Sequence, residues 1–381
     1  MNYDSLLLHT GTEVDEETGA LSLPIYNAST YHQKDISSRQ RYDYSRSGNP
    51  TRCAVEKSLA VLEGGHQGFA FASGMSAISS ALFAVLKAGD HVVVTRDIYG
   101  GAFRFFEKFI SSFGVEYTFV DATKIEEIEK AIRPNTRAIY IETPSNPLLT
   151  ITDISSAARI ARERGLVSLI DNTFMSPYLQ RPIERGIDIS IHSATKFLGG
   201  HSDLLAGAVI TRTEELSRKV GFVQNTLGGV LSPQDSWLLS RGIKTLGARM
   251  KIQSESAMKI ALWLNDQPWV KAVYYPGLPD HPGHALHLSQ AYGSGAVLSF
   301  VVDSLDRIHS LFKNVKMWAV AVSLGGVDSI LSYPWLMSHG SMPPEVKRKL
   351  GIDEKLIRLS VGLESPDDLI LDLNDNAIIR S

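Results

Sequence analysis

The chain of 381 residues contains a single cysteine, Cys53. One thiol cannot form an internal disulfide, nor can it supply a zinc site built on several thiolates. This cysteine usage predicts a protein of a reducing compartment, the cytoplasm. The chain also lacks an apolar run of the roughly 18 residues that cross a bilayer. Residues 1–10 lack the basic flank and apolar stretch of a signal peptide, so we expect no membrane partner.

An excess of positive charge is also missing. The 38 Lys and Arg residues stand against 41 Asp and Glu residues, which gives a net charge of −3. Binding to a nucleic-acid backbone requires a basic surface, so nucleic acid is not an expected partner. The hydrophobic fraction of 44% is that of an ordinary globular protein. The length predicts roughly two to three domains, which is the size of an enzyme.

Helix-like and strand-like segments alternate from about residue 54 to residue 230, which predicts an α/β fold with a mostly parallel sheet flanked by helices. Asp153 is expected to cap a helix over 154–164, and a buried strand follows over 166–170. Another strand is expected over 187–191. Ligands of open α/β sheets bind beyond the carboxyl ends of the strands. The polar residues after these two strands are therefore where we expect chemistry.

The chain divides into three regions. Residues 1–50 are expected to form an arm, because 22–31 look extended and 33–50 are polar, and 51–231 are expected to form the α/β domain. The remainder, 232–381, is expected to be a smaller α+β domain. It begins with a long helical pattern over about 233–264. Its strands are expected at three places: 272–275, 296–302 and 355–361.

A lysine with unusual neighbours follows the strand over 187–191. Ser193 and Thr195 place two hydroxyls just before Lys196, ahead of a glycine pair. A pyridoxal phosphate (PLP) enzyme needs an amine for the Schiff base, hydroxyls for the phosphate and a carboxylate beside the ring nitrogen. Asp171, at the end of the preceding candidate strand, can supply that carboxylate. Alone, Lys196 would be a solvated loop lysine and Asp171 a turn residue, but together they predict a cofactor site.

Three further features agree with this prediction, and each has an ordinary alternative. Gly74 and Met75 lie at a helix start where backbone N–H groups can face a phosphate, although an ordinary cap by Ser73 explains the same sequence. Tyr99 follows a strand and could stack on a planar ring, or be a core tyrosine. Arg358 interrupts an apolar strand and suits a substrate carboxylate, or a surface salt bridge.

Six ordered motifs carry a family resemblance that spans nearly the whole chain: Tyr44–Thr51, Phe71–Met75, Tyr99–Gly101, Glu142–Pro147, Asp171–Phe174 and Ser193–Asp203. On these motifs the chain resembles the PLP-dependent enzymes of cysteine and methionine metabolism, of the cystathionine β-lyase, γ-lyase and γ-synthase type. The resemblance implies the fold of type I PLP enzymes, with a mostly parallel central sheet and a smaller C-terminal α+β domain.

The resemblance also implies roles at the cofactor. Lys196 would be the Schiff-base lysine, Asp171 would pair with the ring nitrogen, and Tyr99 would stack on the ring and take part in catalysis. Four residues would hold the phosphate: Gly74, Met75, Ser193 and Thr195.

The arm and the substrate receive roles from the same resemblance. The arm would cross to the neighbouring subunit, where Tyr44 and Arg46 would reach its phosphate. Active sites are then complete only in a dimer, and a homotetramer built from such dimers is expected. The carboxylate of a small amino-acid substrate would be held by three residues: Asn146, Ser323 and Arg358.

Two positions bear on the reaction. Methionine γ-lyases carry a cysteine where this chain has Gly101, which disfavours methionine as the substrate. Many cystathionine γ-synthases and γ-lyases carry a glutamate where this chain has Val322, and an apolar side chain cannot pair with the distal ammonium of cystathionine. We therefore predict β-elimination from cystathionine or related cysteine thioethers to thiol, pyruvate and ammonia. γ-Elimination and γ-replacement remain the alternatives.

Three histidines recur every three residues: His281, His284 and His287. Zinc sites combine such spacing with further ligands, but the segment offers no nearby carboxylate beyond Asp280 and is interrupted by Pro282. The sequence therefore predicts a solvated helix start here and no metal site.

Overall fold

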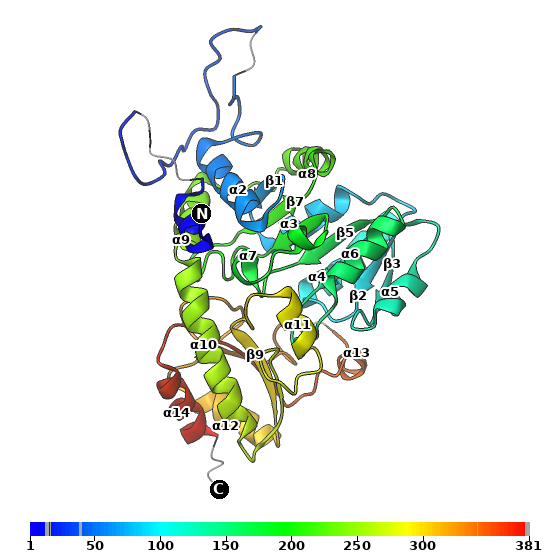
Figure 1. The fold of residues 1–381 in the computed structure, drawn as a ribbon, viewed down its shortest axis with the longest axis vertical. Coiled ribbons are helices and arrows are strands. Elements are labelled where there is room, and N and C mark those ends of the chain that lie inside the picture. The colour runs from blue at the N-terminus through cyan, green and yellow to red at the C-terminus, as the bar shows by residue number, and fades with distance from the viewer. Residues whose placement is uncertain (12–14, 16, 38–39, 341, 378–381) are drawn as a thin grey trace.

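The computed structural model describes residues 1–11, 15, 17–37, 40–340 and 342–377. Within these residues the chain forms one seven-stranded and one five-stranded sheet. The part of the chain around the seven-stranded sheet and the C-terminal part around the five-stranded sheet both lie beside the long helix α10 (Leu246–Asn265), as Figure 1 shows. The predicted fold class, a mostly parallel sheet flanked by helices with a smaller C-terminal α+β part, is confirmed.

The larger sheet has the strand order β1-β7-β6-β5-β4-β2-β3. The strand β7 runs antiparallel to both of its neighbours and the other pairs are parallel. The strands are β1 (Gln67–Phe71), β2 (His91–Thr95), β3 (Glu116–Val120), β4 (Thr136–Glu142), β5 (Val167–Asp171), β6 (Ile189–His192) and β7 (Gly207–Thr211). Because β2, β4, β5 and β6 are parallel, their carboxyl ends meet at one edge of the sheet.

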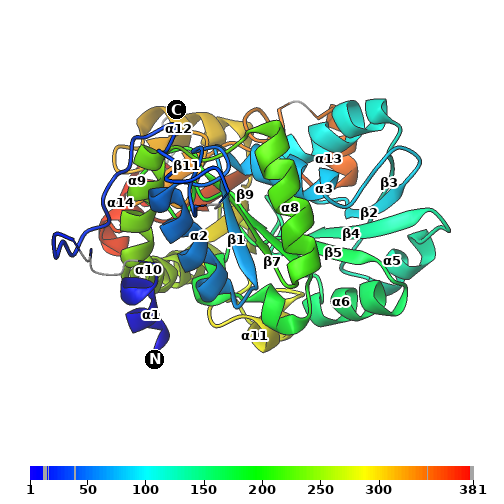
Figure 2. The same ribbon diagram turned by 90° about the horizontal axis from the view of Figure 1, so that it is seen from above.

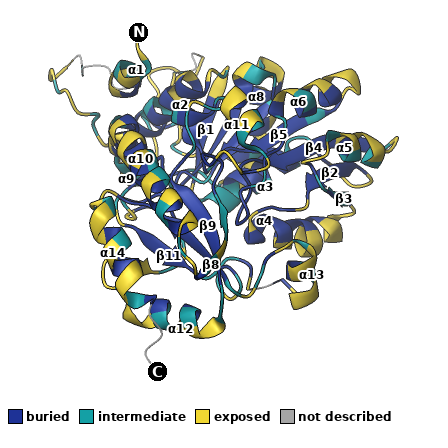
Figure 3. Cartoon of the chain, turned by 60° about the horizontal axis from the view of Figure 1, so that its bottom comes forward, coloured by how far each residue is buried: buried dark blue, intermediate teal, exposed yellow. Residues whose placement is uncertain are grey.

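Helices cover both faces of this sheet, which explains why its strands are nearly continuous apolar runs. One face carries α2 (Pro50–Glu63), α5 (Ile125–Ala131), α6 (Ile154–Glu163) and α7 (Ser176–Leu179). The other carries α3 (Gly74–Phe83), α4 (Gly100–Arg104) and α8 (Glu214–Leu227). Figure 2 shows the sheet between these layers, and Figure 3 shows buried strands beneath helices with exposed outer faces.

The smaller sheet has the order β10-β11-β12-β9-β8 and is mostly antiparallel. Its strands are β8 (Val270–Tyr274), β9 (Val297–Val302), β10 (Ala319–Val320), β11 (Ile330–Ser332) and β12 (Leu356–Ser360). Its helices are α11 (His284–Gln290), α12 (Leu305–Asn314), α13 (Pro344–Lys349) and α14 (Pro366–Asn376). The strands expected over 272–275, 296–302 and 355–361 correspond to β8, β9 and β12 within one residue or two.

Capping residues in the sequence correctly indicate where two helices begin. Asp153 accepts a hydrogen bond from the Ser156 backbone N–H at 2.9 Å, and α6 begins at Ile154 as predicted. Ser73 likewise caps α3 through the Ser76 N–H. The helix α3 ends at Phe83, and the turn that follows, in which the Leu86 N–H donates to the Leu82 carbonyl at 2.8 Å, keeps Leu86 in the core.

The long helix expected over 233–264 is two helices, α9 (Pro233–Lys244) and α10, which meet at Thr245. The break has a tertiary cause. The Arg249 guanidinium donates to the Gly242 carbonyl at 2.8 Å and to the Phe197 carbonyl at 2.8 Å. The Gly242 carbonyl thus accepts hydrogen bonds from the Arg249 side chain and from the Thr245 N–H of a tightened turn. The helical pattern of the sequence could not reveal this arrangement.

The N-terminal region is partly helical. Helix α1 (Tyr3–His9) packs on its own chain, with the Tyr3 hydroxyl donating to the Leu62 carbonyl at 2.7 Å and Lys251 bound to Asp4 at 2.6 Å. Described parts of the segment between α1 and α2 extend away from the body in Figure 1. Residues 12–14, 16 and 38–39 of the predicted arm lie outside the described residues. None of the described helices combines the length and hydropathy that a bilayer-spanning segment needs.

Candidate active site

A cavity of about 460 Å³ lies at the carboxyl edge of the larger sheet, against residues of the C-terminal part. The last residues of β4 and β5, the segments that follow β2 and β6, and the start of α3 contribute to its wall. The structure brings together there all predicted site residues except the two of the arm: Gly74, Met75, Tyr99, Asn146, Asp171, Ser193, Thr195, Lys196, Ser323 and Arg358.

Lys196 lies on the segment after β6, and its Nζ donates a hydrogen bond to Ser323 Oγ at 2.6 Å. Burial, and next the Arg358 guanidinium, lower the pKa of this amine to about 8. Both causes disfavour the ammonium form. Lys196 is therefore an amine with a substantial neutral, nucleophilic fraction near neutral pH.

Asp171 ends β5 and is buried at the cavity wall. Its Oδ1 accepts hydrogen bonds from the backbone N–H of Thr173 at 3.0 Å and from the Thr173 hydroxyl. Burial raises the pKa of this carboxyl, and the Thr173 hydrogen bonds oppose that effect. Within the described residues no cationic side chain forms an ion pair with Asp171. A protonated ring nitrogen in the cavity would be a fitting partner.

Glu142 is a site residue that the sequence analysis missed. It ends β4 directly opposite Asp171 in the parallel ladder. Its carboxylate accepts the backbone N–H of Tyr99 at 2.9 Å and that of Asn146 at 3.2 Å, so it orients the aromatic and amide side of the cavity. Burial, and next the charge of Asp171, raise its pKa well above the usual range. Its position at a strand end, opening one of the motifs, could have identified it.

The start of α3 offers an anion site. The first N–H groups of a helix have no partner within it, and the helix dipole favours negative charge there. Gly74 and Met75 line the cavity at this point. A Cβ on Gly74 would lie 2.8 Å from the Ser193 Cβ, so glycine lets the two loops approach closely. Thr195 is held by hydrogen bonds between its hydroxyl and the backbone of Ala206.

Arg358 lies on β12 and is buried. Its guanidinium donates to Asn146 Oδ1 at 2.9 Å and to the Ser323 carbonyl at 2.7 Å. Burial lowers its pKa to about 10. Within the described residues no carboxylate pairs with it, although it faces the cavity. A buried guanidinium without an anionic partner is suited to receive the carboxylate of a ligand.

Tyr99 lies across the cavity with 41% of its surface exposed. Its ring sits close over Gly101, where a Cβ would lie 2.4 Å from a ring carbon. The absence of a side chain at Gly101 therefore determines where the ring lies.

Tyr44 and Arg46 lie elsewhere. The Arg46 guanidinium stacks on the Tyr44 ring at 5.5 Å, and its side chain passes near Gly228 at the end of α8. Neither residue lines the cavity of its own chain. Their predicted role at a neighbouring subunit stays a prediction.

His284 and His287 lie on α11 and His281 precedes it. His281 and His287 are buried, so the predicted solvated helix start is wrong. His284 donates from Nδ1 to the Pro276 carbonyl at 2.8 Å, and His287 donates from Nε2 to the Gly293 carbonyl at 2.9 Å. Burial lowers the pKa of His287 to about 4. A search of the described residues finds no group of three or more His, Cys, Asp and Glu side chains that could hold a metal ion.

A second cavity, of about 770 Å³, adjoins the first. The two share four lining residues: Thr195, Leu205, Val322 and Ser323. Val322 stands at their junction with 63% of its surface exposed. A substrate that outgrows the first cavity can therefore extend past Val322 into the second.

The residues around the first cavity fit pyridoxal phosphate. When bound, this cofactor supplies an electrophilic carbon for amines and a ring that accepts electrons. Lys196 provides the amine, Asp171 a buried carboxylate at the cavity wall, Tyr99 an aromatic surface and α3 the N–H groups for a phosphate.

Comparison with known proteins agrees. Residues 4–377 match the family described as Cys/Met metabolism PLP-dependent enzyme. Cystathionine beta-lyase MetC of Bacillus subtilis is 52% identical over 366 residues, which cover 96% of this chain and 94% of the relative. Cystathionine gamma-lyase of the same organism is 50% identical over 373 residues, 98% of each chain.

The crystal structure of cystathionine gamma-lyase from Lactobacillus plantarum in complex with L-serine superposes with a TM-score of 0.97 at 46% identity, covering 99% of this chain and 98% of that one. The resemblance and the cofactor predicted from the sequence are thereby confirmed. The chain belongs to the Cys/Met metabolism family of PLP-dependent enzymes.

Proposed function

We propose that the protein is a carbon–sulfur lyase of trans-sulfuration that cleaves L-cystathionine, or related cysteine thioethers, by β-elimination to thiol, pyruvate and ammonia. The proposal depends on one cavity that joins the amine of Lys196, whose pKa is lowered, to the guanidinium of Arg358, which has no carboxylate partner among the described residues, with apolar Val322 at the outlet. The enzyme acts on a small amino acid, as its family does.

Each group has a defined task in this proposal. Arg358 and Asn146 bind the α-carboxylate of the substrate, which fixes the position of its Cα. Lys196 Nζ, released from Ser323, removes the proton at Cα because its lowered pKa makes it an effective base near neutral pH. Asp171 and Tyr99 would hold the cofactor, which would supply a ring that accepts electrons.

The preference for β-elimination depends on Val322. Overall similarity does not separate the reactions, because the named β-lyase and γ-lyase of Bacillus subtilis are 52% and 50% identical to this chain. Val322 cannot form an ion pair with the distal ammonium of cystathionine, which the glutamate of many γ-enzymes can. γ-Elimination or γ-replacement is the second candidate, favoured by carboxylates in the adjoining cavity that could meet that ammonium: Asp203, Asp328 and Glu364.

A product assay tests the reaction. With cystathionine, β-elimination yields pyruvate and homocysteine, whereas γ-elimination yields 2-oxobutyrate and cysteine. A γ-synthase forms cystathionine from an O-acylhomoserine and cysteine without a keto acid. Pyruvate as the main keto acid is the expected result, and Lys196→Ala should produce none. A dominance of 2-oxobutyrate would replace the β-lyase assignment with the γ-lyase one.

We further propose a homotetramer built from dimers that share their active sites. Support comes from Tyr44 and Arg46, which lie outside the cavity of their own chain, and from Leu21 and Ile36 of the arm, whose apolar side chains are exposed. An exposed apolar segment of this kind is suited to cover a neighbouring copy.

Subunit mixing tests the shared site. A Tyr44→Phe, Arg46→Ala double variant and Lys196→Ala are each expected to be nearly inactive. A hybrid dimer contains one site with both an intact lysine and an intact arm, so mixing should restore activity. Each variant incubated alone is the control. Proven subunit exchange without recovery would exclude sharing.

The proposed compartment is the cytoplasm. Its support is the lone cysteine, Cys53, whose thiol pKa is raised by burial, so that it is a poor thiolate and suits a permanently reduced protein. Fractionation of the source cells checks this, and recovery of the protein outside the cytoplasmic fraction would contradict it.

A further inference from the structure

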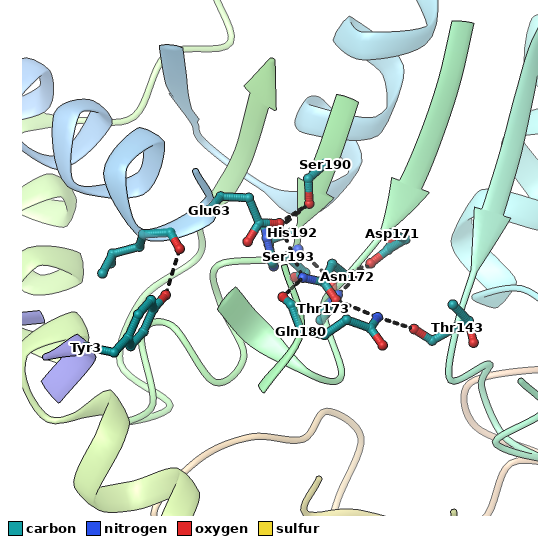
Figure 4. Close-up of polar contacts among 11 residues, drawn as sticks. Tyr3, Glu63, Thr143, Asp171, Asn172, Thr173, Gln180, Ser190, His192 and Ser193 are labelled. Carbon is teal, nitrogen blue, oxygen red and sulfur yellow. Dashed lines mark hydrogen bonds and ion pairs between the residues drawn. The ribbon is translucent and has the colours of Figure 1, made fainter. Parts of the chain in front are cut away.

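A buried carboxylate lies beneath the strand ends that carry the site. Glu63 is the last residue of α2 and has no exposed surface. Three side chains donate to its Oε1: the Ser190 hydroxyl, His192 Nε2 at 3.1 Å and Asn172 Nδ2 at 3.2 Å. Figure 4 shows these donors converging on Glu63 from the ends of β5 and β6.

The network continues toward the end of β4. Asn172 Nδ2 also donates to the Gln180 carbonyl at 2.8 Å, and Gln180 Nε2 donates back to Asn172 Oδ1 at 3.0 Å. The same Gln180 amide donates to the Thr143 carbonyl at 2.9 Å, on the residue that follows β4. Three adjacent strand ends are thus joined through buried polar side chains.

Each strand end in this network carries a residue of the site. Asn172 directly follows Asp171, and His192 directly precedes Ser193. The Ser193 N–H donates to Thr173 Oγ1 at 2.8 Å, and the Thr173 hydroxyl in turn donates to Asp171. The network on one side and the Thr173 hydroxyl on the other therefore fix the separation of β5 and β6 where the two site segments begin.

Electrostatics connect the network to the same carboxylate. His192 acts against the effect of burial on the pKa of Asp171. On the β4 side, Asp171 faces Glu142 and the Tyr140 hydroxyl. The Thr173 hydrogen bonds and His192 thus act together in favour of the carboxylate form of Asp171, and Glu63 orients the His192 ring.

Packing alone does not explain Glu63. Burial of a carboxylate costs more free energy than burial of an apolar side chain of similar volume, unless the charge is paired. A buried carboxylate such as Glu63 is therefore best explained by the geometry that its hydrogen bonds specify. Seven residues earlier on the same helix, Glu56 pairs with Arg52 and accepts the Ala70 N–H of β1. Glu56 contacts none of the ends of β4, β5 and β6 that the network joins, so it offers a comparison on the same helix.

We propose that Glu63 and His192 are positioning residues, which tie the end of β5 to the end of β6 and so hold Asp171 at its working distance from the Ser193–Lys196 segment. The proposal rests on the proposed placement of the cofactor between Asp171 and Lys196.

The test uses the full-length protein and four variants: Glu63→Gln, His192→Ala, His192→Gln and Glu56→Gln. Cofactor affinity of the apoprotein, the pH midpoint of the visible band of the bound cofactor, and kcat and KM are measured. Loss of a charged buried hydrogen bond predicts cofactor binding weaker by roughly tenfold to a hundredfold in Glu63→Gln and His192→Ala. The pH midpoint should move and kcat should fall with KM nearly unchanged, because Arg358 is untouched.

The conservative variants separate positioning from stability. His192→Gln keeps a donor near the place of Nε2 and should recover most of the cofactor affinity. Glu56→Gln should leave cofactor affinity and the pH midpoint unchanged, whatever its melting temperature. If Glu63→Gln fails to fold, Ser190→Ala is used instead, because it removes a single donor to Glu63. It should shift cofactor affinity, the pH midpoint and kcat in the same directions but by smaller amounts.

Wild-type affinity and pH midpoint in the folded Glu63 and His192 variants would overturn the proposal. Equal defects in His192→Gln and Glu56→Gln would also overturn it, since they would indicate a general loss of stability. Asp171→Ala separates this from the proposed function. If Asp171→Ala is itself normal, the cofactor placement is wrong; if it is defective while the Glu63 and His192 variants are normal, only the positioning role fails.

Discussion

The amine of Lys196 offers a quantitative test of the site. Its pKa of about 8 lies 2.5 units below the ordinary value of 10.5. At pH 7 the neutral fraction is then about 9%, compared with about 0.03% for an ordinary lysine, a gain of roughly 300-fold in nucleophilic amine. Burial is the larger cause of this shift and the Arg358 guanidinium the smaller.

Arg358→Gln removes the smaller cause and keeps a side chain that can bind Asn146. Since the smaller of two causes accounts for less than half of the shift, the pKa of Lys196 should rise by no more than about 1.2 units. The neutral fraction at pH 7 should fall by up to about 14-fold. The charge of the buried guanidinium therefore acts on the lysine as well as on the substrate.

The assay is pH-dependent labelling of the apoprotein with a small amine-specific reagent, read by peptide mass spectrometry. Exposed Lys313 on α12 serves as the reference in the same digest. The labelling midpoint of Lys196 should lie near 8 in the wild type and higher in Arg358→Gln. An unchanged or lower midpoint in the variant, with Lys313 unaffected, would refute the electrostatic reasoning.

Three further predictions address stability, cofactor and specificity. Because burial lowers the pKa of His287 to about 4, the unfolded chain takes up this proton first, and the free energy of unfolding falls as the pH drops from 6.5 to 4, by up to about 3.4 kcal/mol. His287→Gln keeps the donor to the Gly293 carbonyl and should lose less stability between pH 7 and 4.5 in denaturant titrations; an equal loss would contradict this. Gly101→Ala should displace the Tyr99 ring and weaken cofactor binding, whereas an unchanged affinity and visible spectrum would argue against the contact. Val322→Glu should raise kcat/KM for cystathionine relative to a neutral S-alkyl cysteine by roughly tenfold, and an unchanged ratio would mean that this residue does not meet the distal half of the substrate.

The sequence located the centre of the site because its signals are local. Asp171 and Lys196 each follow a short apolar strand, and parallel strands bring their carboxyl ends to one edge, so sequence order translated directly into proximity. Gly74 was located in the same way, by its position just inside a capped helix start. No side-chain geometry was needed for these three.

The residues that the sequence did not reveal depend on contacts between distant segments. Glu63 lies 129 positions before His192, and within its own helix it is simply a polar residue at the C-terminal end. Glu142 acts through backbone N–H groups of two other loops, which no side-chain pattern encodes. The division of α9 from α10 likewise needs the side chain of Arg249, a tertiary contact that overrides continuous helical periodicity.

The outlet of the cavity determines the breadth of the reaction. With its carboxylate bound by Arg358 and Asn146 as proposed, an amino acid would extend its side chain toward the open junction where Leu205 and Val322 line both cavities. Both side chains are apolar and largely exposed there. An apolar outlet gains similar contact energy from charged and neutral thioethers, since neither finds a fixed ionic partner at that point. This geometry favours high selectivity for the amino-acid group of the substrate and low selectivity for the leaving thiol. Such selectivity is expected of a β-lyase that accepts several cysteine thioethers.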